Sequence, residues 1–272
     1  TLVNRWNPLP EGWTVDEVEL SNGWAVDSRC YDALQQMMDA CRAEGLYPVV
    51  CSAYRTQAMQ QNIFDQMKQS LLDQGYSDAD AETEAGRQVA VPGTSEHQLG
   101  LAVDIVDLDH QLLDESQEQT AVQQWLMTNS WRYGFILRYP TAKTETTGII
   151  YEPWHYRYVG QPHATYMMEN NVCLEEYLTL LKNYTADEPL SITNWDGEIY
   201  QVYYVAADTS TDSTYVMVPP DAKYTISGNN SDGFIVTVDT GEIQSGDAAA
   251  ATTPEDSAAA DTETATETSA AE

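Results

Sequence analysis

Two short segments of this chain carry the residue types of a catalytic metal site. Residues 95–104 read SEHQLGLAVD, and residues 152–155 read EPWH. A zinc ion in a hydrolase takes three protein ligands from imidazole and carboxylate groups and leaves the fourth tetrahedral position to water. His97, Asp104 and His155 supply such a set. We therefore predict that these three residues bind one zinc ion.

A hydrolase of this kind also needs a carboxylate that lies close to the metal without binding it. This group takes a proton from the water molecule that attacks the substrate. Glu152 stands three residues before the last ligand, and this offset distinguishes it from an ordinary solvated loop residue. We predict that Glu152 is the base, and Glu96, next to the first ligand, is the alternative.

The surroundings of these residues separate them from similar residue types elsewhere in the chain. Asp104 lies in the apolar, β-prone run 101–106, where an unpaired carboxylate would be costly to bury. Metal binding would remove that cost. Of the other two histidines, His110 lies in a polar loop and His163 follows a proline, and neither has a partner at ligand spacing. We expect both of these side chains to be solvated.

These residues resemble the zinc D-alanyl-D-alanine carboxypeptidases of the VanY type, which are related to the VanX-like D,D-dipeptidases and to bacterial L,D-carboxypeptidases. The resemblance covers about residues 2–181. Beyond the two metal segments it includes SAYR at 52–55, YGFILRYP at 133–140 and YRYVG at 156–160. The family's glycine before the Tyr-Arg pair is here Ala53, a change between two small residues. No ligand or base position is substituted.

The resemblance implies a role for each site residue. The three predicted ligands would hold one zinc ion per chain, and Glu152 would be the catalytic base. Arg55 would face the substrate, either as the anchor of its free terminal carboxylate or as a group that stabilises the developing oxyanion. The peptide itself is expected to contact Gln60, Ser95 and Trp154.

The resemblance also implies an activity, namely removal of the terminal D-alanine from peptidoglycan stem peptides, in wall remodelling or in glycopeptide resistance. An L,D-carboxypeptidase that trims tetrapeptide stems shares the same motifs and stays an alternative. A peptidoglycan endopeptidase and a non-catalytic wall-binding protein are further alternatives. The intact Glu152 disfavours the last of these, because pure binding has no use for a base.

The charge of the chain excludes other classes of partner. It has 43 Asp and Glu against 12 Lys and Arg, which gives a net charge of -31. Without a basic stripe, such a protein is not suited to bind nucleic acid or an anionic membrane surface. No run of about 18 apolar residues could span a bilayer, and no signal-peptide pattern opens the chain. We expect an extracytoplasmic monomer, secreted or anchored at the bacterial cell surface, whose signal or anchor is absent from this sequence.

Interspersed helices and strands must position the site residues. The patterns predict helices at about 28–44, 56–73, 78–88, 120–133 and 174–184 and strands at 47–52 and 101–106. Two more strands are expected after the 120–133 helix, and the second of them would carry Glu152 and His155 near its end. Because no βαβ repeat is present, we predict an α+β fold, with a small mixed or antiparallel sheet flanked by helices.

From about residue 190 the pattern changes, and apolar residues alternate with polar ones. Runs of strand length, bounded by turn residues, occur at 198–205, 215–218, 224–227 and 233–238. We predict a catalytic domain over 1–186 and a small β-rich module over 187–245. The Ala/Thr/Glu-rich tail at 246–272 has too few apolar residues to fold and is expected to be disordered.

The four cysteines do not fit a zinc site. Cys30 and Cys41 lie eleven residues apart in one helical pattern, about 16 Å along its axis, which is too far for a disulfide. Cys41 could pair with Cys51, and Cys30 with Cys173, but four free thiols are equally compatible with the sequence.

Overall fold

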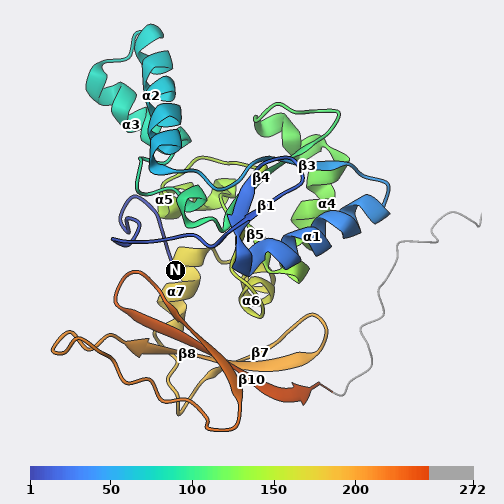
Figure 1. Ribbon diagram of the computed structural model, residues 1–272, viewed down its shortest axis with the longest axis vertical. Helices are drawn as coiled ribbons and strands as arrows, with labels where there is room; N and C mark the ends of the chain where they lie inside the picture. The colour runs from blue at the N-terminus through green and yellow to red at the C-terminus, as the bar shows by residue number, and fades with distance from the viewer. Residues whose placement is uncertain (245–272) are drawn as a thin grey trace, which may run out of the picture.

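The computed structural model describes residues 1–244, which form two stacked units (Figure 1). The upper unit in this view contains a four-stranded antiparallel sheet flanked by helices, and the lower unit is a second four-stranded antiparallel sheet. A helical hairpin projects from the top, and the N-terminus lies where the two units meet. The predicted α+β class is confirmed. The tail predicted at 246–272 lies outside the described residues.

The first sheet places the predicted site residues on adjacent strands. Its order is β3 (Pro48–Ser52), β4 (Ala102–Asp107), β6 (His155–Tyr158) and β5 (Phe135–Leu137). In this register Asp104 stands opposite Ser52 on one side and His155 on the other. Five of the six residues of β4 are buried, which explains its unbroken apolar run.

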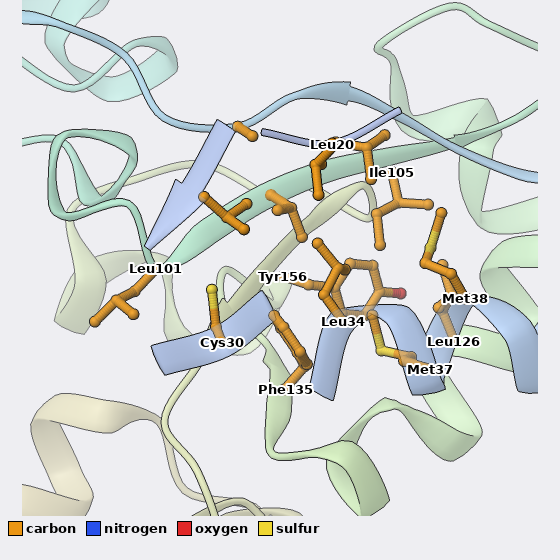
Figure 2. Close-up of a cluster of buried hydrophobic side chains, with 14 of the residues drawn as sticks. Leu20, Cys30, Leu34, Met37, Met38, Leu101, Ile105, Leu126, Phe135 and Tyr156 are labelled. Carbon is orange, nitrogen blue, oxygen red and sulfur yellow. The ribbon is translucent and has the colours of Figure 1, made fainter. Parts of the chain in front are cut away.

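Helix α1 (Ser28–Ala43) packs against this sheet. Its buried side chains recur at helical spacing, as expected of an amphipathic helix. They meet Ile105 of β4, Tyr156 of β6 and Leu126 of helix α4 (Ala121–Asn129) in the main hydrophobic core, which Figure 2 shows.

The remaining helices extend from this core in two directions. Helices α2 (Gln57–Asp73) and α3 (Asp78–Gln88) form the projecting hairpin and enclose a small apolar core of their own. Helices α6 (His163–Glu169) and α7 (Leu174–Leu181) lie on the side of the second sheet. None of the helices described in residues 1–244 is both long and apolar enough to cross a membrane. The shorter elements are β1 (Glu17–Glu19), β2 (Ala25–Asp27), η1 (Glu96–Leu99), η2 (Glu115–Gln119), η3 (Ser130–Tyr133), η4 (Thr141–Lys143) and α5 (Thr144–Thr147).

The second sheet shares a hydrophobic core with the first unit. Its order is β7 (Leu190–Thr193), β8 (Glu198–Ala206), β10 (Gly233–Ile243) and β9 (Lys223–Gly228). Apolar residues of β7, β8 and β10 pack against α6 and α7 in one cluster, which also contains Leu2 and Ile136. The N-terminal segment joins the same contact, because the Leu2 backbone N–H donates to Asn229 O at 3.0 Å. The domain boundary at 186 stays a prediction, and the two units are packed together.

One predicted strand of the second unit is wrong. Residues 215–218 form no strand, although their apolar alternation is typical of one. Val216 and Val218 pack on Tyr203 and Val236 at the outer face of the sheet, while Tyr215 and Met217 are exposed. An extended segment laid over a sheet shows the same alternation as a paired strand. Strand β7, not predicted individually, takes an edge position instead.

The path of the chain near the second metal segment also differs from the prediction. Strand β6 begins at His155, so Glu152 lies in the turn before it and not on the strand. Pro153 explains this start, because proline cannot donate a backbone hydrogen bond to the neighbouring strand. The predicted helix at 120–133 ends as an α-helix at Asn129 and continues as a 3₁₀ turn.

His163 is not solvated, contrary to the expectation. Its Nδ1 lies 2.8 Å from the Tyr177 hydroxyl and its Nε2 lies 3.1 Å from Thr237 Oγ1, so the ring joins α6, α7 and β10. His110 is partly exposed and pairs with Ser116. All four cysteines are free thiols, so neither of the two candidate disulfides forms.

Candidate active site

His97, Asp104 and His155 converge on one point. One ligand atom from each of the three side chains lies within 4.8 Å of the others, and all three residues are buried. This is the one group of at least three His, Cys, Asp or Glu side chains at ligand distance within residues 1–244. The two segments that carry these residues in the sequence therefore meet in space.

The first ligand, His97, is positioned by a tight turn. It lies in η1, and Gly100 ends this turn in the left-handed conformation, with a φ of +74°. His97 Nδ1 lies 2.7 Å from the backbone oxygen of Ala53. Because a carbonyl can only accept, Nδ1 carries the hydrogen and Nε2 presents its lone pair, 3.2 Å from Asp104 Oδ2.

The other two ligands are a cross-strand pair. Asp104 and His155 face each other in the register of β4 and β6, and His155 Nδ1 lies 3.0 Å from Asp104 Oδ1. His155 Nε2 points away from the other ligands, toward Glu96. The atoms that could bind a metal at this point are thus Nε2 of His97, an Asp104 oxygen and Nδ1 of His155.

The electrostatics of His97 and Asp104 fit a cation, whereas interaction with the Asp104 and Glu96 carboxylates outweighs burial and raises the pKa of His155 to about 9, so this imidazole would release a proton on binding one. Burial, together with the nearby Arg55 charge, lowers the pKa of His97 to about 4, so this imidazole is neutral. Burial alone would raise the pKa of Asp104, but the neighbouring His97 and His155 hold it well below its usual value. A neutral imidazole and an ionised carboxylate are the forms that bind zinc.

Glu152 lies beside this ligand set. Its Oε2 is 3.8 Å from His155 Nδ1, and the residue is 9% exposed. Burial raises the pKa of Glu152 to about 8, against the opposing effect of His155. A carboxyl group whose pKa lies above its usual value accepts a proton more readily than an exposed glutamate does.

Arg55 contacts the predicted ligand Asp104 directly. Its Nη2 donates to Asp104 Oδ2 at 2.8 Å, and its Nε donates to Ser52 Oγ at 3.0 Å. Its Nη1 donates to Gln60 Oε1 at 3.3 Å. The guanidinium is therefore held in place by three side chains, next to a predicted metal ligand.

The predicted substrate contacts lie at different depths. Gln60 is fully buried, and its amide accepts from Arg55 and donates to Ala90 O at 2.7 Å. Ser95 is buried at the start of η1, and Trp154 is partly exposed beside β4. The roles of all three in substrate binding stay predictions.

Further buried residues surround His155 and were not singled out from the sequence. Arg138 and Arg157 both donate to Glu96 Oε1, at 2.9 and 2.7 Å. The centroids of the Tyr139 and His155 rings lie 4.8 Å apart. With Oε1 bound to two arginines, Glu96 is poorly suited to act as the base. A sequence signal could have found the two arginines, because both stand beside apolar or aromatic residues in segments that read as strands. A charged side chain buried in such a segment needs an ion-pair partner.

The chain matches known proteins over the part that contains this site. Residues 24–161 match the family model described as VanY: D-alanyl-D-alanine carboxypeptidase, which is just over half of the 272 residues. The chain belongs to the VanY family. It is 51% identical over 182 residues to a D-alanyl-D-alanine carboxypeptidase of Enterococcus faecalis. That match covers 66% of this chain and 66% of the relative, so the chain spans slightly less than two thirds of the relative's length.

Two solved structures extend the VanY comparison. A mutant of the vancomycin resistance D,D-pentapeptidase VanY in complex with Zn(II) is 49% identical, with a TM-score of 0.61. The matched region covers 65% of this chain and 97% of the VanY chain in that structure. The vancomycin resistance D,D-dipeptidase VanXYg, in complex with a D-Ala-D-Ala phosphinate analogue, is 33% identical, with a TM-score of 0.76. This likeness covers 87% of this chain and 92% of VanXYg.

Proposed function

We propose that this chain is a zinc-dependent D-alanyl-D-alanine carboxypeptidase that removes the terminal D-alanine from peptidoglycan stem peptides. The observation that carries the proposal is the convergence of His97, Asp104 and His155, with Glu152 close to His155 and Arg55 bonded to Asp104. Membership of the VanY family, the identity to a D-alanyl-D-alanine carboxypeptidase and the likeness to a zinc-bound VanY structure support it.

Each protein group has a definite task in the proposed reaction. The zinc ion, when bound, would polarise the scissile carbonyl and lower the pKa of a water molecule. Glu152 takes the proton of the attacking water and returns it to the departing D-alanine amine. Arg55 lies 2.8 Å from Asp104, and this closeness favours donation to the developing oxyanion over a role as a distant carboxylate anchor.

The test is a comparison of four peptides with the purified chain. A pentapeptide that ends in D-Ala-D-Ala should release D-alanine, measured by mass spectrometry. A chelator should abolish this release, and added zinc should restore it. The carboxyl-amide of the same pentapeptide detects an endopeptidase, and a tetrapeptide detects an L,D-carboxypeptidase. Release from the tetrapeptide alone would contradict the proposal.

A D,D-dipeptidase activity is the second candidate. It is favoured by the likeness to VanXYg, which covers 87% of this chain and therefore reaches beyond the 24–161 match. The free dipeptide D-Ala-D-Ala is the fourth substrate in the comparison. Cleavage of the dipeptide without cleavage of the pentapeptide would replace the carboxypeptidase proposal by this one.

We also propose that the protein acts outside the cytoplasm as a monomer. Its proposed substrate is a cell-wall peptide, and its net charge of -31 disfavours close approach to anionic lipid. Fractionation of the producing cells and light scattering of the purified chain test the two statements. Recovery in the cytoplasmic fraction, or a dimeric mass, would contradict the corresponding one.

A further inference from the structure

Two buried atoms beside the metal site lack a hydrogen-bond partner. They are Nε2 of His155 and Oε2 of Glu96, and they lie 3.6 Å apart. Within residues 1–244 only one other buried side-chain polar atom is unpartnered, and it belongs to Trp13. A buried polar atom without a partner costs about 1–3 kcal/mol, so a close approach of these two atoms would remove two such penalties at once.

The orientation of the His155 ring defines what Glu96 can do. Since Nδ1 faces Asp104 at 3.0 Å, Nε2 is the nitrogen left to carry the hydrogen when Nδ1 binds a metal. Histidines that bind metals usually donate their other ring N–H to a carboxylate or a carbonyl, which fixes tautomer and ring orientation. We propose that Glu96 is a positioning residue that accepts the Nε2–H of His155 and so holds Nδ1 toward the zinc ion.

Glu96 is itself immobilised by two arginines. Its Oε1 accepts from Arg138 Nε and Arg157 Nη1, and the Glu96 and Arg138 side chains are fully buried. With Oε1 bound to two guanidinium groups, Glu96 is left with Oε2, which faces His155.

The arginines are anchored in parts of the fold remote from the metal. Arg138 binds Glu175 of α7 through two nitrogens, at 2.9 and 2.6 Å, and Glu175 also accepts from Asn4 Nδ2. Arg157 Nη2 donates to the backbone oxygen of Thr1 at 2.7 Å. The two arginines thus connect Glu96 to α7 and to the N-terminal segment, where the two units meet.

The first experiment compares the zinc affinity of Glu96→Gln with that of Glu175→Gln. Glutamine has only one side-chain oxygen, and the two arginines would donate to it. Its NH₂ group would then face the N–H of His155, which places two donors opposite each other. We expect a zinc affinity about 10–100-fold lower than wild type, measured by competition with a chelator. Glu175→Gln removes a charge from the same arginine cluster without altering a residue that contacts His155. Its zinc affinity should stay within about 3-fold of wild type, a smaller change than the one expected for Glu96→Gln.

The results separate orientation from general damage. Wild-type zinc affinity in Glu96→Gln would overturn the inference. An equal loss in Glu175→Gln would overturn it too, because the effect would then come from the arginine cluster. If Glu96→Gln does not fold, Glu96→Asp keeps the charge but shortens the side chain, and it should show the same loss of zinc affinity.

The second experiment needs no variant. In wild-type protein loaded with ¹¹³Cd and labelled with ¹⁵N at histidine, His155 should show metal coupling at Nδ1 and a hydrogen-bonded proton at Nε2. Coupling at Nε2 would overturn the inference. The inference rests on the proposed zinc site, and the two can fail separately. Wild-type protein without metal affinity contradicts the proposed function, whereas tight binding that is indifferent to Glu96 contradicts only the positioning role.

Discussion

At the residue scale, Glu152 is the proposed base, on which proton transfer would depend. Substitution of Glu152 by Gln keeps the shape of the side chain but removes its ability to accept a proton. We expect turnover of the pentapeptide to fall by about two to four orders of magnitude, the usual contribution of a positioned base. Zinc content, measured by elemental analysis, should not change, since the ligands are intact. Turnover within a few-fold of wild type would show that the base lies elsewhere.

Arg55 is the second residue whose role can be separated by kinetics. Arg55→Lys keeps the charge but loses the planar fork that holds Ser52, Gln60 and Asp104 together. We expect kcat to fall in Arg55→Lys and further in Arg55→Ala, while the preference for a free acid over a carboxyl-amide pentapeptide persists.

The control for this series is Arg42→Ala, which removes an exposed arginine whose one ion pair within residues 1–244 is with Asp39. It should leave both kinetic constants unchanged. Loss of the acid preference in Arg55→Ala, with kcat retained, would identify Arg55 as the carboxylate anchor. Unchanged values for both substrates would remove it from the site.

At the scale of the elements, the turn between η1 and β4 sets the distance between two ligands. Gly100 has a φ of +74°, and a Cβ added there would lie 2.6 Å from Val15 Cγ1 and 3.1 Å from the Asp27 backbone N. Gly100→Ala should therefore lower both stability and zinc affinity. Gly45→Ala is the matched control, because its φ is +79° but a Cβ there would meet nothing within 4 Å.

The left-handed conformation alone costs about 1–2 kcal/mol for a residue with a side chain, and both variants share this cost. Chemical denaturation should show a loss of this size for Gly45→Ala and a larger loss for Gly100→Ala. Zinc affinity should fall only in Gly100→Ala. Equal effects of the two substitutions on both measurements would contradict a role for close packing at Gly100.

The N-cap of α1 provides a prediction of pH dependence. Burial would raise the pKa of Asp27, but hydrogen bonds from the Arg29 side chain and backbone outweigh it and lower the pKa. A lowered pKa means that the charged form stabilises the fold fully above the pKa of Asp in the unfolded chain, near 4. This contribution declines below that value and is lost as the pH falls through the lower pKa of the folded state. Asp27→Asn keeps a capping side chain and removes only the charge.

Urea denaturation should show Asp27→Asn to be less stable than wild type at pH 7 and should show a smaller difference at pH 3, on the way to the lowered pKa of the folded state. Asp27→Ala also loses the cap and should be less stable by about 1–2 kcal/mol at pH 7. Asp39→Asn, which alters an exposed pair with Arg42, serves as the control and should have little effect. A constant difference between Asp27→Asn and wild type at both pH values would contradict the charge effect.

At the scale of the whole molecule, the two units depend on each other through a shared core. Ile235 of β10 is 6% exposed in the cluster that contains Leu174, Tyr177 and Leu181 of α7. Ile235→Asp would bury a charge in this cluster and should cost more than about 3 kcal/mol. If the buried charge displaces α7 as a whole, Arg138 and Glu96 would move with it, so the same variant should also weaken zinc binding, an effect that loss of the Glu175 charge alone should not have.

The control is Ile226→Asp on β9, where the side chain is 44% exposed on the outer face. It should leave the melting temperature and the zinc affinity almost unchanged. If Ile235→Asp lowers the melting temperature without affecting zinc binding, the second sheet stabilises the fold without supporting the site. If it changes neither, the second sheet is an independent appendage.

Much of the site could be read from residue types and short spacings. The His97, Asp104 and His155 ligand set, with Glu152 three residues before the last ligand, is visible because metal chemistry restricts both the residue types and their order. Helices α1, α2 and α3 were also predictable to within one residue, because amphipathic periodicity and capping residues are local signals.

The remaining features depend on contacts between segments far apart in the chain. No pattern encodes that Asp104 pairs opposite His155, or that Arg138 and Arg157 meet Glu96 across 42 and 61 residues. Likewise, the alternation at 215–218 suits a paired strand and a segment lying on a sheet equally well, and only the available partner distinguishes them. The chemical types of the site residues can be read from short segments of the sequence. Strand register, buried ion pairs and the ring nitrogen that His155 turns toward the other predicted ligands arise from packing, which forms only when the whole chain folds.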